Sequence, residues 1–331
     1  MKNERRVNSG LGTMHRANFH TVENLPKEEL SIATVRNCVL TRSMLVVTAR
    51  GVHPSCRFEN VPTRTSLKWQ IAGAASLLKN GAVRNVEPGE YYFPFNPWSN
   101  NYFHWLTEIV PKFFLFEREL RSGTIMIPET IGQFAYDFLE MFGFNNFRRF
   151  SRNTFFSELR VITNPNTNHY NLEHLEIVRS RMVENVPSIS NAGRQIYVSR
   201  SGARSRKVSN EDVVISSLEK LGFDIVWPEN MSLREQVEVF GNCGHLVSVH
   251  GAALANVLFM PPNTRLTELY PNIDTNHREF SACYRRLCSV LNIRHHFVFC
   301  SRRDESSGLS LDQDDLVVDM EDLSLRVRAI K

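Results

Sequence analysis

The apolar residues in the second half of the chain form short runs that alternate with longer amphipathic stretches. The short runs are typical of buried strands, and the longer stretches repeat apolar positions with a helical period. Strands that alternate with helices of about 10–15 residues indicate a parallel sheet covered on both faces. The predicted elements are strand 194–200, helix 209–222, strand 223–228, helix 232–244, strand 245–249, helix 252–260, strand 265–271, helix 276–291, strand 294–300, and a last strand and helix within 316–330.

The first half shows the same alternation less regularly. The predicted elements are a strand-like run at 39–49, a strand at 91–95, a helix from residue 101, a strand at 124–128, a helix near 129–142 and a strand at 159–163. The stretch 164–171 is rich in Asn and is the best candidate for a linker.

This pattern predicts an α/β protein with two Rossmann-like domains. The first domain spans residues 1–170, of which 1–85 are poorly assigned, and the second spans 171–331. The last helix could pack back on the first domain. Ligands of open parallel sheets bind beyond the carboxyl ends of the strands. Functional residues are therefore expected in the loops that follow strands and in a cleft between the domains.

One predicted helix of the first half carries polar residues on an apolar background. Asn101, His104 and Glu108 are spaced i, i+3, i+7 and would share one helix face. A structural interpretation makes Asn101 a cap and the other two a self-satisfied pair. A functional interpretation makes His104 a base that faces the cleft, with Glu108 as its partner. Pro111 should kink or divide the helix.

Two further segments combine small and charged residues directly after predicted strands. The first contains Ser199, Arg200 and Arg204 beside a flexible Gly202, and Arg binds phosphate oxygens through its planar fork. The alternative for such a basic run is a solvated loop. In the second, 250–253, a strand ends in His250-Gly251-Ala252-Ala253 and a helix begins at once. Small residues there would let a phosphate approach the backbone amides.

A carboxylate, Glu268, stands within the otherwise apolar strand 265–271. A buried carboxylate is costly unless it faces a partner or a cleft. It would either bind a ribose diol or form a salt bridge with a nearby arginine. None of these segments has the glycine pattern of a dinucleotide-binding loop, a P-loop or a hydrolase elbow.

Composition limits the class of protein. The chain has 331 residues, which suggests two domains, and its net charge of +4 is too small to indicate nucleic-acid binding. The sequence shows neither a signal peptide nor a long apolar run, so a cytoplasmic location is expected. The six cysteines form no CxxC pair and are expected to be reduced structural thiols.

Three segments in this order resemble glycosyltransferase family 61: NYFHWLTEIVP (101–111), YVSRSGARSRKVSNED (197–212) and EQVEVFGNCGHLVSVHGAALANVLFMPPNTRLTELYP (235–271). That family includes bacterial capsule and polysaccharide enzymes, plant xylosyl- and arabinosyltransferases, and animal O-linked N-acetylglucosaminyltransferases. The resemblance covers roughly residues 90–320. It implies a GT-B fold, in which two Rossmann-like domains with parallel sheets face each other across a cleft. It also implies inverting transfer from a nucleotide sugar, expected to be a UDP-sugar.

The resemblance further implies that neither cofactor nor metal is needed. No DxD motif lies in a plausible loop, and Asp314-Asp315 is a pair at the start of the late strand. Basic residues and helix amides can neutralise a diphosphate leaving group in place of a metal.

The motifs also assign roles to the candidate residues. His104 would be the base, and Glu108 would be its partner or an alternative base; Asn101 belongs to the same motif. Arg200 and Arg204 would hold the diphosphate. The remaining donor-site candidates are Ser199, His250 with Gly251, Ala252 and Ala253 for phosphate or ribose, Asn256, and Glu268 for the ribose.

The expected partners are the nucleotide-sugar donor and a glycan or lipid-linked glycan acceptor, in capsule, O-antigen or exopolysaccharide assembly. Association with the inner face of a membrane is compatible with this role, and the oligomeric state stays open. Two alternatives remain: a degenerate member that binds nucleotide sugar or glycan without turnover, and another nucleotide-dependent Rossmann enzyme.

Overall fold

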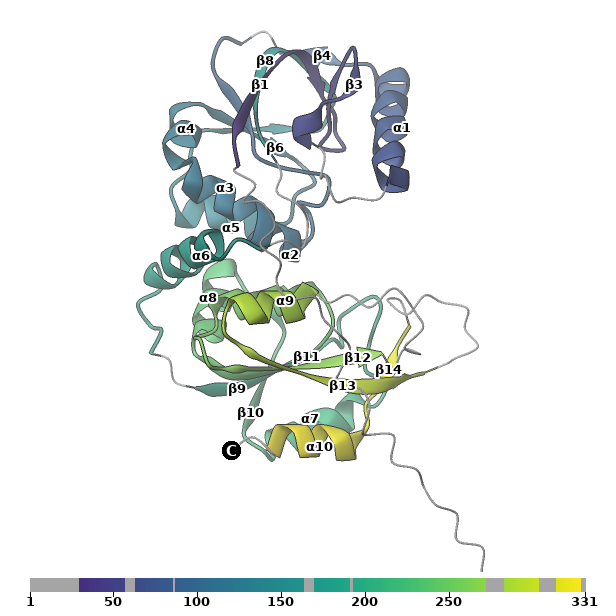
Figure 1. Ribbon diagram of the computed structural model, residues 1–331, viewed down its shortest axis with the longest axis vertical. Helices are drawn as coiled ribbons and strands as arrows, with labels where there is room; N and C mark the ends of the chain where they lie inside the picture. Colours follow the sequence, from purple (N-terminus) through teal and green to yellow (C-terminus); the bar gives the residue numbers. More distant parts are fainter. Residues whose placement is uncertain are drawn as a thin grey trace, which may run out of the picture.

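The computed structural model describes residues 30–56, 63–85, 87–163, 170–190, 193–271, 283–303 and 314–328. These residues form an α/β protein with two separate sheets, one in each half of the chain. Figure 1 shows the two halves as lobes stacked along the long axis of the molecule. Most of the predicted linker 164–171 and the first residues of the predicted helix 276–291 lie outside the described residues.

The first sheet is mixed and has the strand order β3-β2-β1-β8-β5-β6-β7, with β4 paired beside β5 on β8. The strands β8, β5, β6 and β7 are parallel, whereas β1, β2 and β3 run antiparallel. The strand bounds are β1 Ile32–Leu40, β2 Val46–Thr48, β3 Gly51–Val52, β4 Val83–Arg84, β5 Tyr91–Phe93, β6 Thr124–Pro128, β7 Phe147–Phe150 and β8 Thr154–Ile162. The expectation of a parallel sheet in this half is therefore wrong for its N-terminal strands.

The predicted strand-like run 39–49 explains part of this difference. It contains a tight turn, in which Met44 has φ +62° and its backbone N–H donates to Thr41 O at 2.9 Å. The turn separates β1 from β2 and reverses the chain, so that the two pair antiparallel. The apolar pattern continues through this turn because Met44 and Leu45 are themselves buried.

The second sheet has the order β10-β9-β11-β12-β13-β14, and all neighbours are parallel except the edge strand β14. Its strands are β9 Arg194–Val198, β10 Phe223–Val226, β11 Cys243–Val249, β12 Arg265–Pro271, β13 Arg294–Arg302 and β14 Leu316–Val317. The chain direction across the sheet reverses between β9 and β11. In open α/β sheets, ligands bind beyond the carboxyl ends of the strands at such a switch point.

Helices cover both faces of the second sheet, as the alternating pattern predicts. Figure 1 shows α8 and α9 on the face toward the first lobe, and α7 and α10 on the opposite face. The helices are α7 Glu211–Glu219, α8 Leu233–Gly241, the 3-10 helix η5 Ala252–Phe259, α9 Cys283–Val290 and α10 Met320–Arg328. Leu323 and Val327 of α10 are buried in the core of the second sheet. The suggestion that the last helix packs back on the first domain is therefore wrong.

The remaining helices belong to the first lobe or to the junction between the lobes. They are α1 Thr63–Asn80, α2 Tyr102–His104, the π-helix η3 Trp105–Ile109, α3 Val110–Leu115, α4 Glu117–Ser122, α5 Gln133–Met141 and α6 Leu172–Glu184. Helix α6 packs on α3 of the first lobe and on α8 and η5 of the second. One continuous apolar core runs through this junction, so the lobes are joined by packed side chains.

All six cysteines are buried and free, as expected of structural thiols. Within the part of the chain that the structure describes, no helix is both long and apolar enough to cross a membrane.

Candidate functional site

The helix that carries His104 is irregular at its start. Asn101 is its N-cap and accepts a hydrogen bond from Phe103 N–H at 2.9 Å. The turns that follow form the π-helix η3, and α3 begins directly after it at Val110, with Pro111 as its second residue. The backbone stays helical on both sides of this point, so Pro111 lies where the helix changes from π to α rather than at a break. Asn101 is exposed and caps the helix, as the structural interpretation predicts, and it does not share a face with His104 and Glu108.

His104 and Glu108 form a directed pair at the carboxyl end of the first sheet. His104 Nδ1 lies 2.8 Å from Glu108 Oε1, and Asn96 Nδ2 donates to Glu108 Oε2 at 3.1 Å. The imidazole stacks on Trp98 with ring centroids 5.0 Å apart. The His104 side chain is 19% exposed and that of Glu108 is 4% exposed. The carboxylate is therefore a fixed partner of Nδ1, and Nε2 is the nitrogen left to face a ligand.

A buried lysine continues this polar line into the lobe. Lys112, one turn beyond Glu108, is 0% exposed, and its Nζ donates to Pro94 O at 2.8 Å and to Ile162 O at 3.4 Å. These carbonyls lie at the carboxyl ends of the parallel neighbours β5 and β8. Burial lowers the pKa of Lys112 to about 7, although the nearby Glu108 favours the charged form. Lys112 is not among the predicted site residues, although its i+4 spacing from Glu108, which repeats that of His104 and Glu108, is a signal for it.

The loop after β9 supplies the arginines of the second lobe. Arg200 Nε and Nη2 donate to the carbonyls of Arg206 and Ser205 at 3.1 and 3.0 Å, and Glu211 accepts from Arg200 N–H at 2.9 Å. Burial lowers the pKa of Arg200, and the positive charge of Arg206 lowers it further. Two neighbouring guanidinium groups are expected to attract an anion. Ser199 is buried and shapes this turn by accepting from Ser201 N–H at 3.2 Å.

Arg206 was not chosen from the sequence. Its backbone has φ +56°, in the left-handed region that is uncommon for residues other than glycine. Its Nε is buried without a hydrogen-bond partner. Arg204, the predicted phosphate-binding residue, is exposed. The structure therefore favours Arg206 over Arg204 as the companion of Arg200.

The loop after β11 meets this arginine directly. A Cβ placed on Gly251 would lie 2.5 Å from Arg200 Nη1, so only glycine leaves room for the guanidinium there. η5 begins at Ala252, although it is a 3-10 helix rather than an α-helix. Tyr284 of α9 donates to Gly251 O at 2.6 Å. The two strand ends at the switch point thus bring Arg200, His250 and the backbone of Gly251 together, as the sequence predicted.

Glu268 does not face an open site. Its side chain is 1% exposed, with Oε1 bonded to His250 Nδ1 and Oε2 2.8 Å from His295 Nε2. The contact between Oε2 and His295 Nε2 does not have hydrogen-bond geometry, so these two atoms are buried without a hydrogen bond. Burial raises the pKa of Glu268, but the contacts with the two histidines more than offset this and hold it below its usual value. The predicted ribose role of Glu268 is therefore replaced by a contact with two histidines.

Asn256 also has a different place from the one predicted. It is 0% exposed, accepts from Tyr102 Oη at 2.9 Å and donates to Gln236 at 3.0 Å. Its hydrogen bonds therefore join α2 of the first lobe to η5 and α8 of the second, rather than a donor. Phe259 and Met260 are buried, in agreement with their predicted place in the core.

The two candidate clusters are linked by aromatic rings. Phe103 contacts His104 on one side and Tyr284 on the other, with ring centroids 5.2 Å apart in both cases. Tyr284 in turn contacts His250 at 5.3 Å. The histidine of the first lobe and the switch point of the second are thus separated by only two aromatic side chains.

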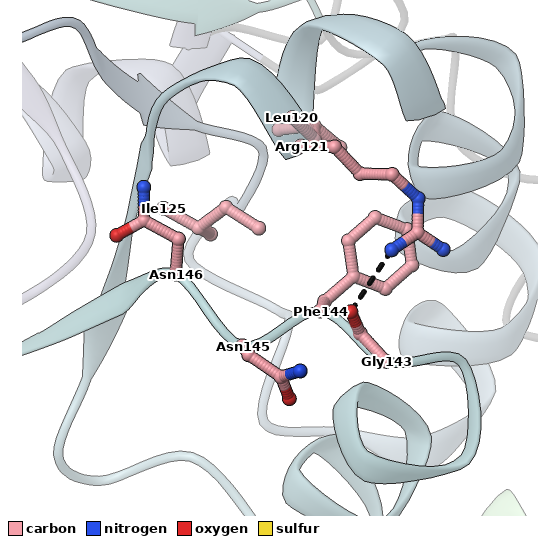
Figure 2. Close-up of a pocket in the computed structure, with 7 residues that line it drawn as sticks. All are labelled: Leu120, Arg121, Ile125, Gly143, Phe144, Asn145 and Asn146. Carbon is pink, nitrogen blue, oxygen red and sulfur yellow. Dashed lines mark hydrogen bonds between the residues drawn. The ribbon is translucent and has the colours of Figure 1, made fainter.

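A separate surface hollow lies on the first lobe, away from these residues. It has a volume of about 200 Å³ and is lined by Leu120, Arg121, Ile125 and 143–146 (Figure 2). Arg121 donates there to the carbonyls of Gly143 and Phe142 at 2.9 and 2.8 Å and also binds Glu117. The hydrogen bonds of Arg121 are therefore used within the fold.

A two-lobed α/β architecture with cations at a switch point is typical of proteins that bind phosphorylated ligands. The model of the glycosyltransferase 61 family matches residues 102–267, which is half of the chain and includes both candidate clusters. The chain belongs to the glycosyltransferase 61 family.

Two relatives are similar over shorter stretches. Over 105 residues the chain is 31% identical to the EGF domain-specific O-linked N-acetylglucosamine transferase of Drosophila melanogaster. This match covers 31% of this chain and 19% of that protein. Over 76 residues the chain is 34% identical to the xylan glycosyltransferase MUCI21 of Arabidopsis thaliana. This match covers 22% of this chain and 15% of that protein. The chain thus matches less than a fifth of the length of either relative.

Proposed function

We propose that the protein is an inverting glycosyltransferase that moves a sugar from a nucleotide sugar to a hydroxyl group. Family membership supports glycosyl transfer. The observation that carries the proposal is the meeting of two clusters, the His104–Glu108 pair and the Arg200–Gly251–His250 cluster, across Phe103 and Tyr284. A transferase needs a base for the acceptor and an anion site for the leaving group, and these clusters have the matching chemistry.

On the donor side, the diphosphate would lie at the switch point of the second sheet. Arg200 and Arg206 would bind its oxygens, and the backbone amides after Gly251 would approach it because no Cβ intervenes. The donor would be a UDP-sugar, as the family resemblance implies. The lobes would act as the two domains of a GT-B enzyme, each placing its cluster at the carboxyl ends of parallel strands.

On the acceptor side, His104 would remove the proton. As the acceptor oxygen attacks the anomeric carbon, the proton moves to His104 Nε2 and the bond from that carbon to the diphosphate oxygen breaks. The electron pair leaves with the nucleoside diphosphate, and attack from the opposite face inverts the anomeric centre. Glu108, bonded to Nδ1 at 2.8 Å, would stabilise the imidazolium that forms.

We propose that this step needs no metal, because the arginine side chains and His250 can balance the charge of the leaving group. Residues 312–314 do read Asp-Gln-Asp, but Asp314 is 4% exposed and accepts from Arg302 at 2.8 Å. Turnover should therefore survive EDTA. Complete loss of activity in EDTA with rescue by Mn²⁺ or Mg²⁺ would contradict this part of the proposal.

The proposed acceptor is a glycan or lipid-linked glycan, in capsule, O-antigen or exopolysaccharide assembly. The relative named for xylan supports a polysaccharide, whereas the relative named for EGF domains supports a protein hydroxyl as the competing acceptor. With a lipid-linked glycan, the protein would work in the cytoplasm at the membrane surface.

A thermal-shift panel of UDP-, GDP-, CMP- and TDP-sugars tests the donor. A ligand at about 100 times its dissociation constant should stabilise the fold by about 2.7 kcal/mol. Incubation of the stabilising donor with candidate acceptors, followed by NMR of the product anomer, then tests inversion. Binding without transfer to any glycan or protein acceptor would favour a degenerate binding protein, and stabilisation by none of the four would contradict the proposal.

A further inference from the structure

Glu268 is enclosed by two histidines from different strands. His250 follows β11, Glu268 is on β12 and His295 is on β13. The carboxylate bonds His250 Nδ1 through Oε1 and lies against His295 Nε2 through Oε2. The side chain of His295 is only 5% exposed, so it is too buried to contact a bound nucleotide directly. His250, the most exposed of the three, is the group at which the cluster reaches the switch point.

The groups around Glu268 determine which of them can balance its negative charge. Two neutral groups on α9, Tyr284 and Cys288, lie near Glu268, and the charge of Glu268 raises the pKa values of both. Tyr270 and Tyr284 contact the ring of His250. The nearby cations are Arg206, which lies near Tyr284, and Arg200, which lies against Gly251. Burial is the main cause of the raised pKa at Tyr284 and Cys288, so both stay neutral at ordinary pH. The fully buried carboxylate therefore has the two histidines as its adjacent sources of compensating charge.

The orientation of His250 decides what it can offer. Its Nδ1 faces Glu268, so Nε2 is the nitrogen available toward the anion site of Arg200 and Gly251. Phosphate oxygens only accept hydrogen bonds, and an imidazole with a donor on both nitrogens is the protonated form. A carboxylate on Nδ1 stabilises that form.

We propose that His295 is a positioning residue that holds Glu268 so that His250 presents a protonated Nε2–H to the phosphate of the leaving nucleotide. This inference rests on the proposed function and names a charge within the same donor site. His295 Nε2 lies 2.8 Å from Oε2 and so fills the space beside the second carboxylate oxygen, which keeps Oε1 directed at His250 Nδ1. Partners behind metal-ligating histidines typically change metal affinity or activity about 10- to 100-fold, and we expect an effect at the lower end of that range for a histidine that binds a phosphate.

The test is UDP affinity by calorimetry between pH 5.5 and 8.5, for wild type, His250→Asn, His295→Asn and the double variant. His295→Asn should weaken UDP binding roughly tenfold at pH 6.5, and the weakening should shrink as the pH rises and His250 loses its proton. The titration of UDP itself cancels in the ratio of the affinities of variant and wild type at each pH. The double variant should bind no worse than His250→Asn alone, because His295 acts through His250.

His296→Asn is the matched control. His296 is the next residue on β13, points to the other face of the strand and is half-buried. It should leave the pH profile of UDP binding unchanged. A lowered melting temperature of His295→Asn with a wild-type UDP profile would show a purely structural role and overturn the inference, as would additive losses in the double variant. Wild-type protein that binds neither UDP, GDP nor CDP would instead contradict the proposed function.

Discussion

The two histidine–glutamate pairs of this protein are built in opposite ways. His104 and Glu108 are one turn apart on one helix, whereas His250 and Glu268 are 18 residues apart and meet across adjacent parallel strands. Both carboxylates are nearly fully buried, and both bind Nδ1 of a partly exposed imidazole. The local pair uses Asn96 and, more distantly, Lys112 to hold its carboxylate, while the other uses His295.

This difference separates two kinds of histidine chemistry. In the first lobe, Glu108 accepts from Asn96 as well as contacting His104, and the buried Lys112 lies nearby. In the second lobe, each oxygen of Glu268 lies against a histidine. The surroundings of the two carboxylates therefore differ, which fits the proposed roles of His104 as a base and of His250 as a phosphate-binding cation.

The largest expected effect comes from His104→Ala. General-base catalysis typically contributes about 10² to 10⁴ in rate, so kcat should fall by that order. UDP affinity should stay close to wild type, because the proposed donor site is on the other lobe. Steady-state kinetics and calorimetry on the same preparation measure both quantities. Near-normal kcat in a folded variant would make the pair structural and break the comparison.

Glu108→Gln refines the first assignment. If Glu108 only orients His104 and stabilises its charge, the amide variant should lose less kcat than His104→Ala. If Glu108 is itself the base, Glu108→Gln should lose more kcat than His104→Ala. The ratio of the two kcat values, measured with the same donor and acceptor, decides between the roles. Asn101→Ala serves as a control, because it removes a helix cap and should affect stability rather than kcat.

Arg200→Ala should weaken UDP binding by about 2 kcal/mol or more, within the range for loss of one member of a buried charge pair. Gly251→Ala should have a similar but smaller effect, because a Cβ would lie 2.5 Å from Arg200 Nη1 and displace the guanidinium. The clash involves the end of a flexible side chain, so the melting temperature should change little. Calorimetry with UDP measures both variants. Unchanged affinity in Arg200→Ala would contradict its role.

The smallest expected effect is a change in the pH dependence of stability through Lys112. Its folded-state pKa of about 7 lies below its ordinary value of 10.5. Between these values the unfolded chain binds more protons, so this lysine makes unfolding free energy rise with pH, by at most about 1.4 kcal/mol per pH unit. Below pH 7 both states are protonated and the contribution is flat.

Urea denaturation of wild type and Lys112→Met at pH 7, 8 and 9 measures this contribution. Wild-type stability relative to the variant should rise across that window, and the exposed Lys79→Met should show no such trend. A pH-independent difference between wild type and Lys112→Met would mean that the lysine stays charged in the fold across this window, and it would contradict the lowered pKa from which the prediction follows.

The sequence by itself determined the local features of this protein. The alternating pattern of the second half predicts its parallel sheet, because buried parallel strands need apolar runs and crossover helices need amphipathic ones. Glycine and small residues after strands identified the segment at Gly251, and the spacing of His104 and Glu108 identified their pair. Each of these signals lies within one element or one loop.

The tertiary structure alone decided which groups meet across elements. Glu268 was visible as a charge in an apolar strand, but its contact with His295 depends on which strands are neighbours. Arg206 and Arg204 are equivalent in the sequence, but in the fold Arg206 has a left-handed backbone and is half-buried, whereas Arg204 is exposed. Asn256 became a link between lobes because Tyr102 reaches it from 154 residues away. Side-chain contacts at such separations follow from packing, which local spacing does not encode.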